Sequence, residues 1–193
     1  NVPAKAIDVP SSPYDIVLTT KTGATVNTNS SEIGVGSGQS LDDGDVIRID
    51  FVNVTVTGSG GSAVATFNEY YSANAFRQDV TGLSGPQRAD FTVKAIAIVN
   101  NANGQALPAD GDTVFYGDTN DTTVSGTTLN IYNAAGVLQT TAQLTAAGVT
   151  VTNMGGGVWR VLNLPNNYDY EIVSATTPFQ AVQVDALTGT DTF

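Results

Sequence analysis

The sequence predicts an all-β protein, an antiparallel β-sandwich or jelly roll of about eleven strands. Apolar and polar residues alternate along most of the chain, which is typical of strands with one buried face. The 3.6-residue spacing of amphipathic helices is nearly absent, and Gly- and Asn-rich turns separate the alternating segments. With 193 residues, 41% of them hydrophobic, the chain can bury one substantial core.

Each strand is predicted from its own stretch of alternation, and the short connections between them favour antiparallel pairing. The expected strands are residues 14–20, 45–57, 63–70, 90–100, 113–116, 129–132, 137–139, 149–153, 159–164, 168–173 and 179–186. Tight turns at 133–136 and 155–157 are rich in Gly and join two of the pairs as hairpins. We expect a single sandwich domain over residues 14–193, preceded by an extended arm over residues 1–13.

Two of these strands carry more specific information. In the segment 45–57 the apolar residues change parity between Phe51 and Val52. This change predicts a β-bulge, or a strand that passes from one sheet to the other. The segment 90–100 is apolar on both faces beyond Lys94, which predicts a central strand covered on both sides.

The arm over residues 1–13 contains Pro3, Pro10 and Pro13 and only scattered apolar residues, so it cannot anchor itself by core burial. We expect it to leave its own sandwich and pair with another subunit, through Ala4–Val9 or Tyr14–Thr20. The predicted subunit contacts are Ala4, Ala6, Ile7, Val9, Tyr14, Ile16 and Leu18. The chain begins at Asn1, which we interpret as the start of a processed, mature product.

The net charge and the composition limit the kinds of partner that the protein can bind. The net charge is −11 and basic clusters are absent, which argues against nucleic acid and anionic membranes. No apolar run approaches the ~20 residues of a membrane helix, so membrane insertion is not expected. Only 13% of the residues are charged, so the surface is built from Thr, Ser, Asn and Gly. This surface favours a secreted, extracellular or cell-surface protein, held together without disulfides because Cys is absent.

The residue types argue against catalysis. The chain has neither His nor Cys, so its Ser and Thr hydroxyls have no evident general base. Four carboxylates could supply an acid/base pair: Asp50, Glu69, Asp169 and Glu171. Asp169 and Glu171 share one strand face opposite Tyr170, and we favour a solvated face over a catalytic one. We therefore predict that the protein is not an enzyme.

Two acidic loops are candidates for calcium. Asp42 and Asp45 lie in one, and Asp110 and Asp112 in the other. Calcium takes six to eight oxygen ligands, which such loops can supply. Asp and Gly also dominate tight turns that hold no metal, and we favour that alternative. No other cofactor is indicated.

Four aromatic residues could form a platform for stacking against sugars: Tyr70, Tyr71, Phe76 and Trp159. Aromatic residues of β proteins belong more often to the core. Trp159 alternates with Val161, which predicts that it is buried. Tyr70 and Tyr71 must point to opposite faces of a strand, which leaves room for one exposed ring.

Two segments carry a family resemblance: residues 34–52, GVGSGQSLDDGDVIRIDFV, and the end of the chain, with YDYEIV at 168–173, TPFQAVQV at 177–184 and GTDTF at 189–193. They resemble β-sandwich modules of type I-secreted, calcium-associated (RTX/VCBS-like) bacterial surface proteins and adhesins. The resemblance covers about a third of the chain and implies a secreted sandwich module. The GGxGxDxxx nonapeptide repeats of that family are absent.

These observations together predict a structural subunit of an extracellular homopolymeric assembly, such as a filament, surface layer or adhesin. Its partners would be copies of itself, joined by strand addition of the N-terminal arm. A carbohydrate-binding module that recognises surface glycans is the first alternative. A viral capsid or decoration protein is the second, because it shares the jelly-roll expectation.

Overall fold

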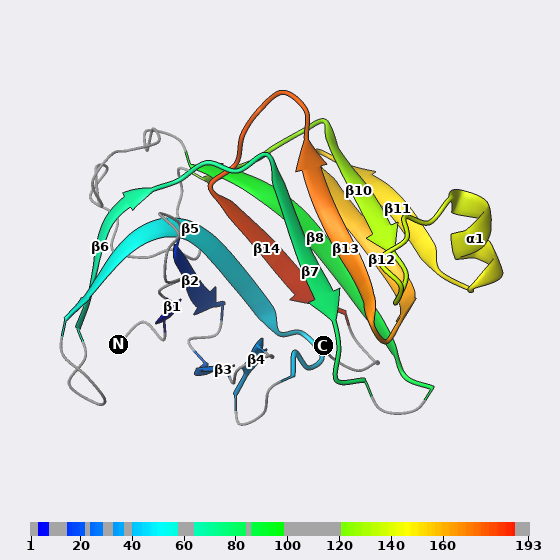
Figure 1. The fold of residues 1–193 in the computed structure, drawn as a ribbon, viewed down its shortest axis with the longest axis horizontal. Helices are drawn as coiled ribbons and strands as arrows, with labels where there is room; N and C mark the ends of the chain where they lie inside the picture. The colour runs from blue at the N-terminus through cyan, green and yellow to red at the C-terminus, as the bar shows by residue number, and fades with distance from the viewer. Residues whose placement is uncertain are drawn as a thin grey trace.

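The chain forms two antiparallel β-sheets of very different width that pack face to face, as a computed structural model shows (Figure 1). The all-β sandwich predicted from the sequence is therefore confirmed. The structure describes residues 4–7, 15–21, 24–28, 33–36, 40–57, 64–83, 86–98 and 121–187. Within these ranges no helix is long and apolar enough to cross a membrane.

The wide sheet has nine strands, seven of which follow one path in the order β1-β2-β5-β14-β8-β12-β11. The two others extend it locally, β6 alongside β5 and β9 alongside β8. The bounds are β1 Ala4–Ile7, β2 Asp15–Thr20, β5 Val46–Thr57, β6 Val64–Tyr70, β8 Arg88–Ile98, β9 Asp121–Thr123, β11 Thr150–Gly155, β12 Val158–Pro165 and β14 Ala181–Ala186. Every pairing in this sheet is antiparallel.

The narrow sheet has three strands in the order β10-β13-β7 and lies over one face of the wide sheet, which we call the inner face (Figure 1). Its strands are β7 Ala75–Val80, β10 Thr127–Tyr132 and β13 Tyr168–Ser174. A small hairpin of β3 Val26–Thr28 and β4 Ile33–Val35 forms a third sheet. The short helix α1, Thr141–Ala146, lies beside β10, β11 and β12 at the far end (Figure 1).

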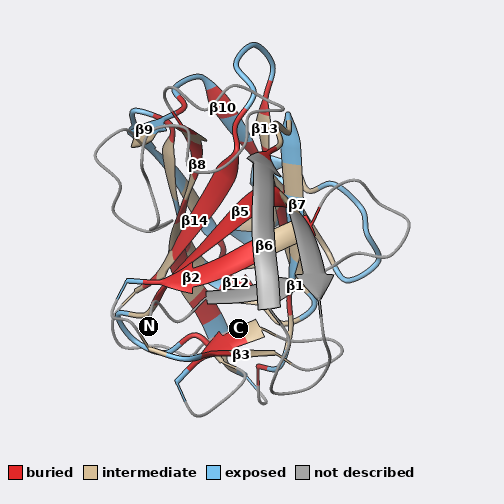
Figure 2. Ribbon diagram, turned by 90° about the vertical axis from the view of Figure 1, so that its left-hand side faces the viewer, coloured by how far each residue is buried: buried red, intermediate tan, exposed pale blue. Residues whose placement is uncertain are grey.

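The core lies between the two layers (Figure 2). Phe91 of β8 and Tyr170 of β13 meet across it, with ring centroids 4.9 Å apart. Beyond the narrow sheet, Leu18 of β2 is buried in the same cluster as Val26 and Val35 of the hairpin. The β3–β4 hairpin therefore belongs to the covering of that end of the wide sheet.

One of the two specific predictions for strands holds as made. The β5–β6 pairing does shift register between Asn53 and Val54, but their partners are Glu69 and Phe67, so the extra residue is Asn68 of β6 and not a residue of β5. The strand β8 is central, between β14 on one side and β12 and β9 on the other, and its Ala95 and Ile96 are both buried. Apolar content was sufficient to identify the central strand, whereas the parity change in β5 did not show that the extra residue lies in β6.

Other predictions were wrong or untested. The segment 137–139 forms only an isolated bridge, between Tyr132 and Leu138, rather than a strand. The helix α1 was missed because it is six residues long and buries none of them. A capping box holds its start, with the Thr140 side chain accepting from the backbone N–H of Gln143. The predicted strand at 113–116 lies outside the described residues.

Gly157, in the turn between β11 and β12, supports a sharp prediction. Its φ is +83°, and a Cβ built there would lie 1.9 Å from the carbonyl oxygen of Val124. Gly157→Ala should lower the free energy of unfolding by about 3 kcal/mol, because a backbone clash is added to the strain of a positive φ. Urea unfolding measures the change.

Gly156→Ala is the matched control. Its φ is also positive, at +60°, but a Cβ there meets nothing within 4 Å. Gly156→Ala should therefore lower the free energy of unfolding only by the backbone strain, roughly 1 kcal/mol. Equal losses in the two variants would contradict the close approach of Gly157 to Val124.

Candidate functional site

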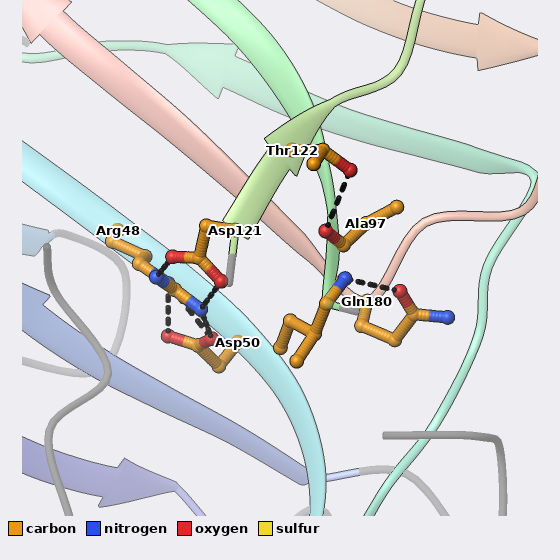
Figure 3. Close-up of polar contacts among 7 residues, drawn as sticks. Arg48, Asp50, Ala97, Asp121, Thr122 and Gln180 are labelled. Atoms are coloured by element: carbon orange, nitrogen blue, oxygen red, sulfur yellow. Dashed lines mark hydrogen bonds and ion pairs between the residues drawn. The ribbon is translucent and has the colours of Figure 1, made fainter. Parts of the chain in front are cut away.

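A charged cluster lies at the centre of the wide sheet, on the face opposite the narrow sheet, which we call the outer face. Ile47, Ile49 and Phe51 of β5 point into the core. Side chains alternate along a strand, so Arg48 and Asp50 point to the outer face. Arg48 is paired with Asp50, its Nη2 lying 2.7 Å from Oδ1 and its Nε donating at 2.9 Å. Its Nη1 is also paired with Asp121 of β9 (Figure 3).

Burial governs the electrostatics of this cluster. Arg48 is 1% exposed and Asp50 is 0% exposed. Desolvation raises the pKa of Asp50 to about 7, against the opposing attraction of Arg48. Burial acts to lower the pKa of Arg48, but Asp50 and Asp121 outweigh it and leave that pKa above its ordinary value. One guanidinium thus faces two carboxylates in a water-poor site.

The geometry fits a structural ion cluster. The cluster connects β5 to β9, two strands that are not neighbours in the sheet. Close by, the Gln180 side chain accepts from the backbone N–H of Ile98 at 2.9 Å and donates to the Ser72 hydroxyl at 2.7 Å. The hydroxyl of Thr122 donates to the Ala97 carbonyl (Figure 3). Sequence reasoning placed Asp50 but missed Asp121, because no local pattern links residues 73 positions apart.

A second polar cluster lies on the narrow sheet. Arg77 of β7 donates from Nε to Asp169 at 3.0 Å, and its guanidinium carbon lies 3.9 Å from the centroid of the Tyr132 ring. Hydrogen bonds from Tyr132 and Asn130 hold the pKa of Glu171 below its ordinary value. Asp169 and Glu171 alternate with the buried Tyr170, as predicted. Glu69, the fourth carboxylate considered, lies in β6, where its side chain is not described.

The acidic loop at Asp42 and Asp45 has the hydrogen bonds of a turn. The carboxylate of Asp45 accepts from the backbone N–H of Asp42 at 2.9 Å, and the Asp45 N–H donates to the Asp42 carbonyl. In the described ranges no three acidic side chains come together in a way that could hold a metal ion. Calcium at this loop stays a prediction, and Asp110 and Asp112 lie outside the described residues.

The N-terminal segment differs from the prediction. Ala4, Ala6 and Ile7 belong to β1, which pairs with β2 of the same chain, with Ala4 opposite Thr19 and Ile7 opposite Ile16. Ile16 and Leu18 lie in β2, which pairs with both β1 and β5, and Leu18 is fully buried within the single chain. Their role as subunit contacts stays a prediction. Pro3 and Pro10 leave a proline-free stretch long enough for this short ladder. Val9 and Tyr14 lie outside the described residues.

The four aromatic residues do not form one platform. Tyr70 is 3% exposed, whereas Tyr71, Phe76 and Trp159 are partly buried. The Phe76 ring packs against Phe51, with centroids 5.8 Å apart. Trp159 of β12 lines a cavity beside α1 instead. It is less buried than its alternation with Val161 predicted.

The edge strands of the two sheets are a further candidate for function, because an edge strand can pair with a strand of another molecule. The seven-strand path ends at β1 on one side and at β11 on the other. Most of β11 is exposed, and its sequence, TVTNMG, has no charged residue and no proline. At the edges of the narrow sheet, Ile131 of β10 accepts a hydrogen bond from the backbone N–H of Gln139, and β7 carries the charged residues Arg77 and Asp79.

Comparison with known proteins gives no further assignment: no family model matches the chain, and no curated protein or solved structure is significantly similar to it.

The raised pKa of Asp50 predicts how stability depends on pH. The unfolded carboxyl titrates near 3.9 and the folded one at about 7. The folded state therefore binds the proton more tightly, and this stabilisation is complete below pH ~4 and lost as the pH rises through ~7. The free energy of unfolding should fall by roughly 3 kcal/mol over this window, measured by urea unfolding at each pH.

Asp50→Asn should remove this part of the pH dependence, because an amide does not titrate. Asp169→Asn, on the narrow sheet, is the matched control and should leave the dependence in place. If the free energy of unfolding changes equally with pH in Asp50→Asn and in the unaltered protein, Asp50 is ionised in the folded protein over the whole of this pH range.

Proposed function

We propose that the protein is a structural subunit of an extracellular homopolymeric assembly, in which copies join edge to edge through the two ends of the wide sheet. The observation that carries this proposal is the exposed, uncharged edge strand β11, at the end of the path opposite β1. The sequence predicted an N-terminal arm that leaves its own sandwich to reach a neighbour. In the present proposal β1 instead forms one edge of its own sandwich and pairs with a neighbour from there.

The two edges are suited to one another. An edge strand presents unpaired N–H and C=O groups that accept another strand. A register shift after Asn153 leaves the regular ladder of β11 at Thr150–Asn153, four residues long. β1 also forms a ladder of four pairs, Ala4–Ile7. Pairing β1 of one copy with β11 of the next would continue the sheet from subunit to subunit.

Such a contact joins different surfaces of two copies. A heterologous contact of this kind repeats without closing and builds a filament or a layer unless its rotation happens to close a ring. Backbone hydrogen bonds would supply most of its affinity, which suits a chain with few charged residues. The net charge of −11 opposes close packing of copies at low salt, so assembly should strengthen as ionic strength rises.

The extracellular location rests on composition and resemblance. A surface of Thr, Ser, Asn and Gly with 13% charged residues is common in exported proteins. The segments 34–52 and 168–193 resemble modules of secreted bacterial surface proteins.

Single cysteines test the contact, because the chain has none of its own. We expect a mixture of Ala6→Cys and Thr152→Cys proteins, or of Ala6→Cys and Thr150→Cys, to form a disulfide-linked heterodimer under mild oxidation. Residues opposite one another in a continuous antiparallel sheet bring their Cβ atoms to ~4.5–5.5 Å, close to the ~3.5–4.5 Å that a disulfide needs. Non-reducing gel electrophoresis with mass spectrometry measures the linked species.

Thr176→Cys is the matched control, since Thr176 is exposed but lies outside any strand. It should form a disulfide with Ala6→Cys no faster than two exposed cysteines that meet only by random collision. Equal linkage of Thr176 and Thr152, or linkage only between copies of the same variant, would contradict a head-to-tail edge contact.

A further inference from the structure

A cavity of about 500 Å³ opens at the end of the sandwich, between β10, the helix α1 and strands β11 and β12. This volume lies within the ~300–1,000 Å³ typical of small-molecule sites. None of Arg48, Asp50 and Asp121 lines the cavity, whereas Asn130, which donates to Glu171 of the polar cluster on the narrow sheet, does. Figure 1 shows the elements that supply the lining, β10, α1, β11 and β12, side by side at one end of the sandwich.

The cavity exists because the chain leaves the edge of β10 early. Gln139 donates its backbone N–H to Ile131 at 2.8 Å, and the chain then turns into α1. The helix buries no side chain completely, and Leu144 is its only residue packed against the core. Segment 137–148 therefore covers one side of the cavity without filling it. Leu138 lines the cavity and is 52% exposed.

The walls combine one aromatic ring with aliphatic and neutral polar groups. Trp159 is held in place, since its indole N–H donates to the Thr127 hydroxyl at 3.0 Å. Leu129 and Val149 supply the aliphatic part. The polar part comes from Gln139, Thr141 and Thr150. None of the lining residues is charged.

These walls define the chemistry of a ligand. A charged group would lose its hydration without gaining a counter-ion, so an ionic ligand is disfavoured. The Gln139 amide nitrogen already donates to the Val137 carbonyl at 2.8 Å, but a purely aliphatic ligand would cover the Gln139 amide oxygen and the threonine hydroxyls without giving them partners. A pyranose ring has an apolar face, which can stack on an indole, and a rim of neutral hydroxyls, which can pair with Gln139 and the threonines.

We propose that this cavity is a binding site for a neutral saccharide, with one sugar ring stacked on Trp159 and its hydroxyls paired with Gln139. Thr150 and Val151 of the edge strand β11 line the cavity, so a strand added at that edge would lie close to the bound sugar. The site would give each subunit a recognition surface in addition to its structural role.

The test uses the fluorescence of Trp159, which is the only tryptophan in the chain. The full chain, in dilute solution, is titrated with D-glucose, D-galactose, N-acetyl-D-glucosamine and cellobiose. We expect a saturable change in emission with at least one of these sugars. Isothermal titration calorimetry with that sugar then compares the variants.

Trp159→Leu should weaken binding about tenfold or more, because it removes the stacking surface and keeps an apolar side chain. Gln139→Ala, a change at a partly exposed position, should weaken binding severalfold and leave the melting temperature near its original value. Tyr71→Leu, a similar loss of a partly buried ring that lies outside this cavity, is the control and should bind as the unaltered protein does.

Three results would overturn the proposal. The first is no saturable change with any of the four sugars. The second is unchanged affinity in both Trp159→Leu and Gln139→Ala. The third is a saturable signal with 1-octanol but with none of the sugars, which would assign the cavity to an aliphatic ligand.

Discussion

The difference in width between the two sheets determines most of this structure. Nine strands form one layer and three form the other, so the narrow sheet can cover only part of the inner face. An apolar sheet face left open would be unstable in water, so other segments must close the two ends. On the β2 side, the β3–β4 hairpin buries Val26 and Val35 against Leu18. On the other side, α1 and the segment before it lie over the end of the core.

The two ends are closed to different degrees, and the proposed functions follow from this difference. At the β2 end the core reaches full burial, with Leu18 at 0% exposure. At the α1 end a six-residue helix cannot fill the space, and a cavity remains beside Trp159. The width of the large sheet also separates β1 from β11, which leaves one edge on each side of the subunit. A long sheet with distant edges can add copies at both.

The outer face shows that the centre of the wide sheet is buried on both sides. Arg48 and Asp50 lie there in place of apolar residues, and Asp121 completes the cluster from β9. Such a cluster adds little net stability over apolar packing, but the loss of one partner leaves a buried charge unpaired. We interpret it as fixing the position of β9 relative to β5, since each charge has to meet its partner.

The sequence predicted the features that depend on local pattern. Alternation identified most of the strands, and apolar content identified the central position of β8. The parity change near Phe51 lies close to the register shift between β5 and β6, but it did not reveal that the extra residue belongs to β6. Pairing between distant segments could not be predicted in this way. Nothing local connects Arg48 to Asp121, and the prolines of the arm did not reveal that Ala4–Ile7 would pair with β2. The capping pair Thr140 and Gln143 was a readable signal for α1 that alternation alone overlooks.

Amide hydrogen exchange, followed at low and at high protein concentration, tests the central claim most directly. If the wide sheet continues from copy to copy, amides of β11 and β1 should exchange more slowly at high concentration. Amides of β8 and β14, which already have neighbours on both sides, should be unchanged. Two results would contradict an assembly built through the edges of the wide sheet. Exchange could slow at high concentration only in strands other than β1 and β11, or it could slow in no strand at any concentration.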